Sequence, residues 1–300
     1  MTDIFKSGYA SIVGRPNVGK STLLNCLMAK KVAVTSNRPQ TTRNKITGVL
    51  HLPGAQIVLV DTPGIHKSDR TLNEMMVRAS VSTFSDVDLL LVMLSAESGF
   101  CVEDEFVLNS MRGVKTKKVL VINKVDLVDK SNLLILMDEM NQKSLFEEII
   151  PISALKEDGL NQLKSLIINY LPEGPEYFPK DMDTDCPETF LFGELIREKI
   201  LKLTRFEIPH SVAVVVEDMY EQNNGVVQID ATIYAEKDSQ KKILIGERGS
   251  MLKNIGRQAR QDIEKRIGAK IFLKLFVKVK ANWRDQKKTI KEFGYTHDSF

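Results

Sequence analysis

Apolar and polar residues alternate in two different rhythms along the first 171 residues. Short apolar runs, typical of strands buried in a sheet, alternate with segments whose apolar residues recur at helical spacing. The predicted strands are 9–13, 46–52, 56–60, 89–94, 119–122 and 149–152, and the predicted helices are 21–29, 72–84, 103–111, 131–145 and 160–170. This alternation predicts a doubly wound α/β domain, in which ligands bind beyond the carboxyl ends of the strands.

The alternation stops between residues 171 and 188. Four of the ten prolines fall here, at Pro172, Pro175, Pro179 and Pro187, together with acidic residues at positions 181, 183 and 185. Proline favours extended chain and interrupts helices, so 172–188 is predicted to be a linker between a domain at 1–171 and another at 189–300. The second domain reads as a helix (189–206), strands (211–217, 226–235), two helical segments (239–268) and a last strand (269–280), which predicts a smaller α+β domain.

The composition is that of an ordinary globular protein, with 43% hydrophobic and 27% charged residues in a chain of 300. The first six residues have no basic stretch leading into an apolar one, and the longest apolar run, near 87–96, is too short for a bilayer. We therefore expect a cytoplasmic location. Three separated cysteines, Cys26, Cys101 and Cys186, show neither disulfide nor zinc-ligand spacing.

Charge is distributed unevenly along the chain. Residues 237–292 hold 17 Lys+Arg against 6 Asp+Glu, a local charge of +11, whereas the net charge of the whole chain is +3. The remainder is therefore acidic by −8. A basic terminal domain on an acidic body indicates a polyanionic partner, either a nucleic acid or a lipid surface.

One motif in the first domain dominates the candidate chemistry. Two glycines spaced as in a phosphate loop are followed by a lysine and hydroxyl residues: Gly14, Arg15, Pro16, Asn17, Val18, Gly19, Lys20, Ser21 and Thr22. Backbone N–H groups of such a loop surround a polyphosphate, the lysine reaches its outer phosphates, and the serine ligates Mg²⁺. A strand precedes the motif and a helix follows it, which is the context that this binding mode requires.

Three further motifs follow predicted strands, where the ligand of such a sheet lies. Asp61, Thr62, Pro63 and Gly64 provide a carboxylate for Mg²⁺ and a glycine N–H for a γ-phosphate. Asn123, Lys124, Val125 and Asp126 end in a carboxylate able to accept hydrogen bonds from the two donors of guanine, which adenine lacks, and Ser153, Ala154 and Leu155 offer a backbone N–H to the base oxygen. Together these motifs predict a GTP site.

The basic second domain contains a Gly-x-x-Gly loop. It consists of Gly246, Glu247, Arg248, Gly249 and Ser250, and the helix after it carries Lys253, Arg257 and Arg260 away from its apolar stripe. Two glycines let the backbone approach a sugar-phosphate chain closely, as in KH domains, and Arg248 can neutralise a phosphate. We therefore expect RNA to bind here.

Strict alternation marks the last strand, 269–280. Its odd positions are apolar, whereas Lys274 and Lys278 share the even face with Phe272 and Phe276. Basic residues interleaved with aromatics are typical of single-stranded nucleic-acid binding. The alternative is a strand packed on both faces, with the phenylalanines in a core. Trp283 is equally open to two interpretations, an RNA contact or a hydrophobic cap of the domain.

The residues of these motifs, together with Pro39-Gln40-Thr41-Thr42-Arg43 and the segment around Trp283, resemble those of the Era family of translation-factor-like GTPases. The resemblance extends over essentially the whole chain. The resemblance implies a P-loop GTPase domain followed by a type II KH domain. It also implies that 35–44 is the first switch loop and that Thr42, with Thr41 as the alternative, is a ligand of Mg²⁺. The polar, aperiodic composition of 35–44 fits a segment that orders around GTP.

The residue after Gly64 is Ile65, which cannot orient a water molecule as the glutamine of many regulatory GTPases does. The resemblance therefore implies slow intrinsic hydrolysis, with K⁺ in place of an arginine finger and Asn17 as its candidate ligand. His66 lies close enough to be considered as a base, although a surface role is the simpler interpretation. Lys20, Thr42, Gly64 and Asn17 are the residues expected to act in the transition state.

By resemblance, the partner is the 3′ end of small-subunit (16S) ribosomal RNA, and the process is assembly of the small ribosomal subunit. The chain is then a monomeric switch in which GTP orders the two switch loops. Two alternatives stay open from the sequence. One is an RNA-binding protein in which the nucleotide has only a structural part, and the other is a GTPase peripheral to the membrane surface.

Overall fold

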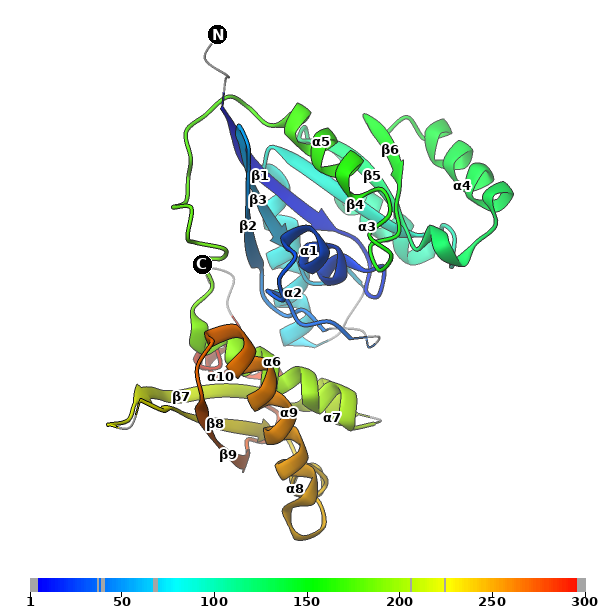
Figure 1. The fold of residues 1–300 in the computed structure, drawn as a ribbon. Coiled ribbons are helices and arrows are strands. Elements are labelled where there is room, and N and C mark those ends of the chain that lie inside the picture. The colour runs from blue at the N-terminus through cyan, green and yellow to red at the C-terminus, as the bar shows by residue number, and fades with distance from the viewer. Residues whose placement is uncertain are drawn as a thin grey trace. The chain divides into compact units, whose positions relative to one another are not determined.

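A computed structural model describes residues 5–36, 38, 41–66, 70–205, 207–223 and 225–295. The chain forms two compact units, and the main division between them along the sequence falls between Asp185 and Cys186 (Figure 1). Within the described part of the chain, no helix has both the length and the apolar character that crossing a membrane requires.

The first unit is built on a six-stranded sheet in the order β2-β3-β1-β4-β5-β6. Its strands are β1 (Lys6–Val13), β2 (Ile46–Leu52), β3 (Ala55–Asp61), β4 (Leu89–Ser95), β5 (Lys117–Asn123) and β6 (Glu148–Pro151). Only β2 runs antiparallel to its neighbour. The central strands are buried on both faces, which explains why they read as continuous apolar runs.

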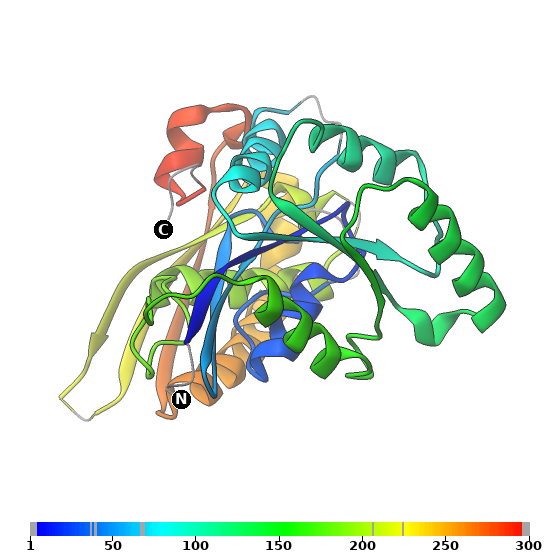
Figure 2. The ribbon, with the colours of Figure 1, turned by 90° about the horizontal axis from the view of Figure 1, so that it is seen from above.

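Helices cover both faces of this sheet, as a doubly wound fold requires. They are α1 (Lys20–Met28), α2 (Thr71–Ser82), α3 (Val102–Ser110), α4 (Lys130–Gln142) and α5 (Leu160–Tyr170). Figure 2 shows α1 and α5 on one side of the strands and α2 and α3 on the other. The second side holds a core of β4 and β5 residues against α3, α4 and Phe84. The predicted order of strands and helices is confirmed.

Two predicted helix ends were wrong for local reasons. The α4 helix stops at Gln142 rather than at 145, and Ser144 adopts a left-handed backbone with φ 50°. The first helix of the second unit ends at Leu203 because Thr204 is extended and its hydroxyl bonds back to Ile200 O at 2.7 Å. Position 206, the predicted end, lies outside the described residues.

The connecting segment, residues 172–185, packs on the first unit although it has no regular secondary structure. Its backbone bonds to the start of β1 and to the edge strand β2: Ser7 N donates to Pro172 O (3.1 Å) and Val49 N donates to Asp183 O (2.8 Å). The fully buried Gln56 side chain accepts hydrogen bonds from Tyr177 N and Phe178 N and donates one to Phe178 O. Most of the segment predicted as a linker is therefore fixed to the first unit.

The second unit is a three-stranded sheet in the order β7-β8-β9, with the last pair parallel. Its elements are α6 (Glu188–Leu203), α7 (Ile208–Ser211), β7 (Ala213–Glu221), β8 (Val227–Ala235), α8 (Asp238–Ile245), α9 (Ser250–Ile267), β9 (Ile271–Val279) and α10 (Lys287–Glu292). The α6, α8 and α9 helices pack on the sheet, and Figure 1 shows α6 and α9 against the same face of it. The short α7 and α10 were not predicted.

Candidate nucleotide site and candidate RNA groove

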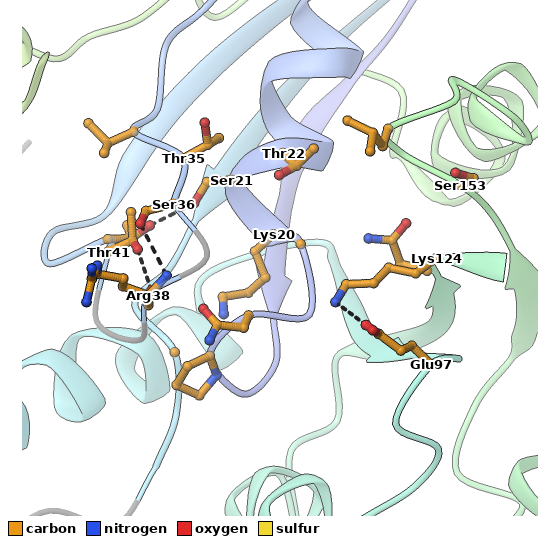
Figure 3. A pocket seen from close by; sticks show the side chains of 18 of the residues that line it. Lys20, Ser21, Thr22, Thr35, Ser36, Arg38, Thr41, Glu97, Lys124 and Ser153 are labelled. Carbon is orange, nitrogen blue, oxygen red and sulfur yellow. Dashed lines mark hydrogen bonds and ion pairs between the residues drawn. The ribbon is translucent and has the colours of Figure 1, made fainter. Parts of the chain in front are cut away.

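A cavity of about 560 Å³ opens beyond the carboxyl ends of the central strands of the first unit. Its lining comes from the phosphate loop, the 34–42 loop, Gly64, the Asn123–Asp126 motif and Ser153. Figure 3 shows Lys20 between two walls, one formed by Thr35, Ser36, Arg38 and Thr41 and the other by Lys124, Glu97 and Ser153. Four motifs that are far apart in the sequence thus meet at one place.

Lys20 is buried in the phosphate loop, with a relative exposure of 6%. Its ammonium donates to Gly14 O (3.0 Å) and Arg15 O (2.9 Å). Burial lowers the pKa of Lys20 to about 8, and the nearby Asp61 carboxylate only partly opposes this effect. The loop needs glycine at position 19, where φ is 104° and an added Cβ would lie 2.3 Å from Asn123 Nδ2.

The three predicted Mg²⁺ ligands lie together. Ser21 Oγ is 2.7 Å from Thr42 Oγ1 and donates to Asp61 Oδ2 at 2.6 Å, and Thr42 Oγ1 donates to the same oxygen at 3.3 Å. Burial raises the pKa of Asp61 to about 6, against the opposing charge of Lys20. Asp61 Oδ1 is buried and makes no hydrogen bond within the described structure. Two hydroxyls and a carboxylate with a spare oxygen fit a Mg²⁺ ion.

The neighbouring Thr41 is directed elsewhere, since its hydroxyl donates to Arg38 O at 2.6 Å. Of the two alternatives left open by the sequence, Thr42 is therefore the one beside Ser21 and Asp61. Of the other residues of the resemblance motif, Arg43 is buried, and positions 39 and 40 lie outside the described residues.

Gly64 comes so close to the phosphate loop that a side chain could not fit. An added Cβ would lie 2.7 Å from both N and Cγ of Pro16. The next residue, Ile65, is fully buried in the core, and its N–H donates to Gly14 O at 3.2 Å. Ile65 thus has a packing role, while His66 Nδ1 lies 2.8 Å from Gly64 O.

The two central residues of the Asp61–Gly64 motif are hydrogen-bonded to neighbouring elements. Thr62 Oγ1 donates to Ile12 O (2.8 Å), and Pro63 O accepts from Ser80 Oγ (2.8 Å). In the phosphate loop, Val18 is buried, whereas Asn17 is exposed, has φ 66° and lines the cavity together with Thr22.

The base-recognition motifs are tied to each other and to the phosphate loop. Asn123 Nδ2 donates to Val18 O (2.9 Å), and its Oδ1 accepts from Ala154 N (2.9 Å). Ser153 Oγ donates to Asp126 Oδ1 at 2.6 Å, which fixes this carboxylate at the cavity wall. Val125 N bonds to Ile152 O (3.3 Å), so the whole motif is held beside β6.

Sequence reasoning missed Glu97 in this site. Its carboxylate pairs with Lys124 Nζ at 2.8 Å, and both side chains line the cavity. Its position was a usable signal, because Glu97 follows β4 and therefore lies at the ligand-binding edge of the sheet. Thr35, Ser36 and Arg38 also line the cavity; they fall within the predicted switch loop but were not singled out.

The second unit has a groove of about 830 Å³ between α9 and the edge strand β9. Gly249, Ser250, Lys253, Arg257 and Arg260 line it, and so do apolar side chains of α9 and β9. Gly246, Arg248 and Gly249 have φ of 74°, 49° and 79°, so the loop turns sharply and leaves its backbone accessible. An added Cβ at Gly246 would lie 2.7 Å from Met251 N. Glu247 belongs to the same turn.

Lys274 and Lys278 lie outside this groove. They alternate with Leu273 and Leu275, which line it, and so belong to the other face of β9; from that face only Phe272, at the start of the strand, reaches the groove. On that side Lys274 Nζ lies 4.0 Å from an oxygen of Asp230 and 5.7 Å from the centre of the Phe276 ring. Their role in RNA binding stays a prediction.

The suggestion that the two phenylalanines of this strand form a core was wrong. Phe272 is 53% exposed and Phe276 is 44% exposed, because the helices cover only the other face of β9. Trp283, in contrast, is fully buried. Its Nε1 donates to Ser211 O at 2.9 Å, and its ring packs against Phe293 and Tyr295. Trp283 therefore caps the unit.

Comparisons with known proteins agree with this geometry. The family model described as "50S ribosome-binding GTPase" matches residues 9–124, and the KH domain model matches residues 207–284. The chain is 48% identical to GTPase Era of Geotalea daltonii over 97% of this chain and 98% of the relative. It is 49% identical to GTPase Era of Lactobacillus helveticus, over 97% and 96%.

Two solved structures are similar over the whole chain. One is an Era variant of Aquifex aeolicus bound to GDP·AlF4⁻, with a TM-score of 0.95, 39% identity and coverage of 97% of this chain and 100% of that one. The other is Era in complex with MgGDPNP and nucleotides 1506–1542 of 16S ribosomal RNA, with the same TM-score and identity and coverage of 97% and 99%.

Proposed function

This chain belongs to the Era family of GTPases, and from that premise we propose how its residues divide the work of a GTP-hydrolysing, RNA-binding protein. The protein hydrolyses GTP to GDP and phosphate, with a Mg²⁺–nucleotide complex as substrate. Its KH unit binds small-subunit ribosomal RNA, and it acts in assembly of the small ribosomal subunit.

The observation that carries the residue assignment is the convergence of Ser21, Thr42 and Asp61 on one point, next to the buried Lys20. Ser21 and Thr42 would hold Mg²⁺ directly, and Asp61 would hold it through water. Bound Mg²⁺ neutralises charge on the β- and γ-phosphates. Lys20 and the loop N–H groups bind the phosphates, and Gly64 N–H faces the γ-phosphate. Asp126 selects guanine, and Ala154 N–H would exchange Asn123 Oδ1 for the base oxygen.

K⁺ is the second cation that we propose. Ile65 is buried in the core and cannot orient water; by resemblance to the family, K⁺ would take the place of an arginine finger in stabilising the charge of the transition state. Asn17 lines the cavity with an exposed side chain and is the candidate ligand. Turnover is expected to be faster in K⁺ than in Na⁺ at equal ionic strength, and Asn17→Ala is expected to remove that difference. Equal rates in the two salts would contradict the proposal.

We place the RNA site in the groove between α9 and β9. Gly249, Lys253 and Arg257 line it, so a single strand would have its phosphates near the loop and its bases over apolar side chains. We further propose domains at 1–171 and 189–300, with most of the connecting segment fixed to the first of them, and a monomer located in the cytoplasm. Contact of the basic unit with anionic membrane surfaces is a second possibility, and RNA competing for liposome binding would test it.

The decisive experiment is GTP hydrolysis with and without a short RNA copy of the 3′ end of small-subunit ribosomal RNA. RNA is expected to accelerate turnover of the intact chain. Gly246→Asp should keep only the basal rate, and Lys20→Ala should lose turnover while still binding RNA. If RNA leaves turnover of the intact chain unchanged, the two units do not form a coupled switch, and the view of a structural nucleotide in an RNA-binding protein gains support.

A further inference from the structure

A buried carboxylate outside the nucleotide cavity holds one end of the phosphate loop. Asp104, in the first turn of α3, is 1% exposed. Its oxygens lie 3.0 Å and 3.2 Å from Arg15 Nε. None of the four nucleotide motifs contains Asp104, and it does not line the cavity.

Arg15 connects three segments through its guanidinium group. Besides the ion pair with Asp104, Nη2 donates to Ser98 Oγ, and Nη1 lies 3.5 Å from Pro16 O within the loop itself. A planar guanidinium held at three nitrogens has one orientation only. The 14–17 part of the loop is therefore fastened to α3 and to the turn after β4.

The backbone that Arg15 fixes in this way carries the key contacts of the loop. Arg15 O and Gly14 O accept the two hydrogen bonds of Lys20, and Gly64 packs on Pro16. The 97–98 turn that contacts Arg15 also bears Glu97, the partner of Lys124 in the guanine motif. One ion pair thus lies behind both the phosphate end and the base end of the cavity.

We propose that Asp104 is a positioning residue for nucleotide binding, which acts through Arg15 by holding the 14–17 part of the phosphate loop in its binding conformation. The inference rests on the proposed nucleotide site. Asp104 also accepts hydrogen bonds from Cys101 N (3.2 Å) and Cys101 Sγ (3.0 Å), which cap α3. A purely structural role as a helix cap is therefore the alternative that an experiment must separate.

The test measures GDP dissociation, the KM and kcat for GTP, and thermal unfolding of the full chain. Asp104→Asn keeps the size and an oxygen for the helix cap but removes the charge from Arg15. We expect GDP dissociation to become about tenfold faster, because losing one partner of a buried charge pair raises a dissociation rate, while Lys20 still holds Gly14 O and Arg15 O. The KM is expected to rise more than kcat falls, because the loss is in ground-state binding.

A double-mutant cycle identifies the path. If Asp104 acts through Arg15, Asp104→Asn adds nothing to Arg15→Gln, and the two effects on GDP dissociation are strongly non-additive. Cys101→Ala removes one cap contact and Glu105→Gln changes an exposed neighbour on α3. Both are expected to leave GDP dissociation unchanged.

Two results would overturn the inference. One is unchanged GDP dissociation in Asp104→Asn with a lowered unfolding temperature, which would assign only a helix-capping role. The other is tighter GDP binding, which would mean that the released Arg15 charge acts on the phosphates without any positioning. Lys20→Ala, measured in parallel, tests the underlying site: loss of GDP binding there, with no effect of Asp104→Asn, rejects the positioning role and leaves the nucleotide site standing.

Discussion

Lys20 and Asp61 are both buried, and burial shifts their pKa values toward neutrality from opposite sides. The pKa of Lys20 is lowered to about 8 and that of Asp61 is raised to about 6. Each charged form lacks solvation that a ligand would restore: phosphate oxygens for the ammonium group and Mg²⁺ for the carboxylate. Without nucleotide, the site is therefore expected to exchange protons within a physiological range of pH.

Nucleotide binding should be accompanied by proton uptake near pH 8 and by proton release near pH 6. Near pH 8, binding stabilises charged Lys20, so protons are taken up and affinity falls as the pH rises. Near pH 6, Mg²⁺ requires ionised Asp61, so protons are released and affinity falls with decreasing pH. Calorimetry of Mg·GDP binding in buffers of different ionisation enthalpy measures both. Asp61→Asn should abolish the proton release by the protein near pH 6, so that only the protons released by the nucleotide phosphate remain.

Asp126 should determine which base is accepted. Asp126→Asn replaces an acceptor by a group that can also donate, which suits xanthine, whose C2 carries an oxygen in place of the guanine amine. GTP affinity should fall by a factor on the order of 10⁴, and XTP should become the better substrate. Hydrolysis assays with both nucleotides measure the exchange. Glu97→Gln changes another charge at the same wall and is expected to keep guanine preference.

Single residues of the site could be predicted from the sequence wherever they belong to a motif of fixed spacing. Lys20, Ser21 and Asp61 are such cases, because their separation from a strand end dictates where they lie. Pairs formed across the fold could not be predicted. The ion pairs Arg15–Asp104 and Lys124–Glu97 produce no local pattern in the sequence. Each depends on the relative positions of elements that are distant in the sequence.

Elements were predictable where apolar spacing is long and regular, and unpredictable where they are short. The α9 helix has a clear apolar stripe and ends in a left-handed glycine, Gly268. The α7 and α10 helices have only 4 and 6 residues, too few for a period to emerge. The buried face of β9 could be predicted from its apolar odd positions, but whether its other face is also covered could not, because alternation does not tell whether a second layer packs there.

At the level of one loop, Gly246→Asp tests the RNA groove. The φ of 74° and the close approach to Met251 disfavour any side chain, and the aspartate adds a negative charge beside the phosphate path. RNA affinity should fall at least tenfold, a loss of about 1.4 kcal/mol, while GDP affinity stays the same. Gly268→Asp is the matched control: φ is also 74°, with no atom near an added Cβ. Equal losses of RNA binding in both variants would reject the groove.

For the whole molecule, the connecting segment decides where the first unit ends. Gln56→Ala would leave three backbone groups of Tyr177 and Phe178 without their partner. We expect a loss of stability of about 2–4 kcal/mol and faster proteolytic cleavage within 172–185. Urea unfolding and limited proteolysis measure these effects. Gln142→Ala, on the exposed end of α4, should change neither, and an uncleaved segment in Gln56→Ala would contradict the anchoring role.

The connecting segment also covers one edge of the sheet. The β2 strand is an edge strand, and edges of this kind offer unpaired N–H and C=O groups to any other extended chain. Val49 N is bonded to Asp183 O and His51 Nε2 lies 3.0 Å from Met182 O, so this edge is already covered by the protein's own backbone. A chain cut after residue 171 would lose that cover, and its β2 would be open to intermolecular strand addition and aggregation.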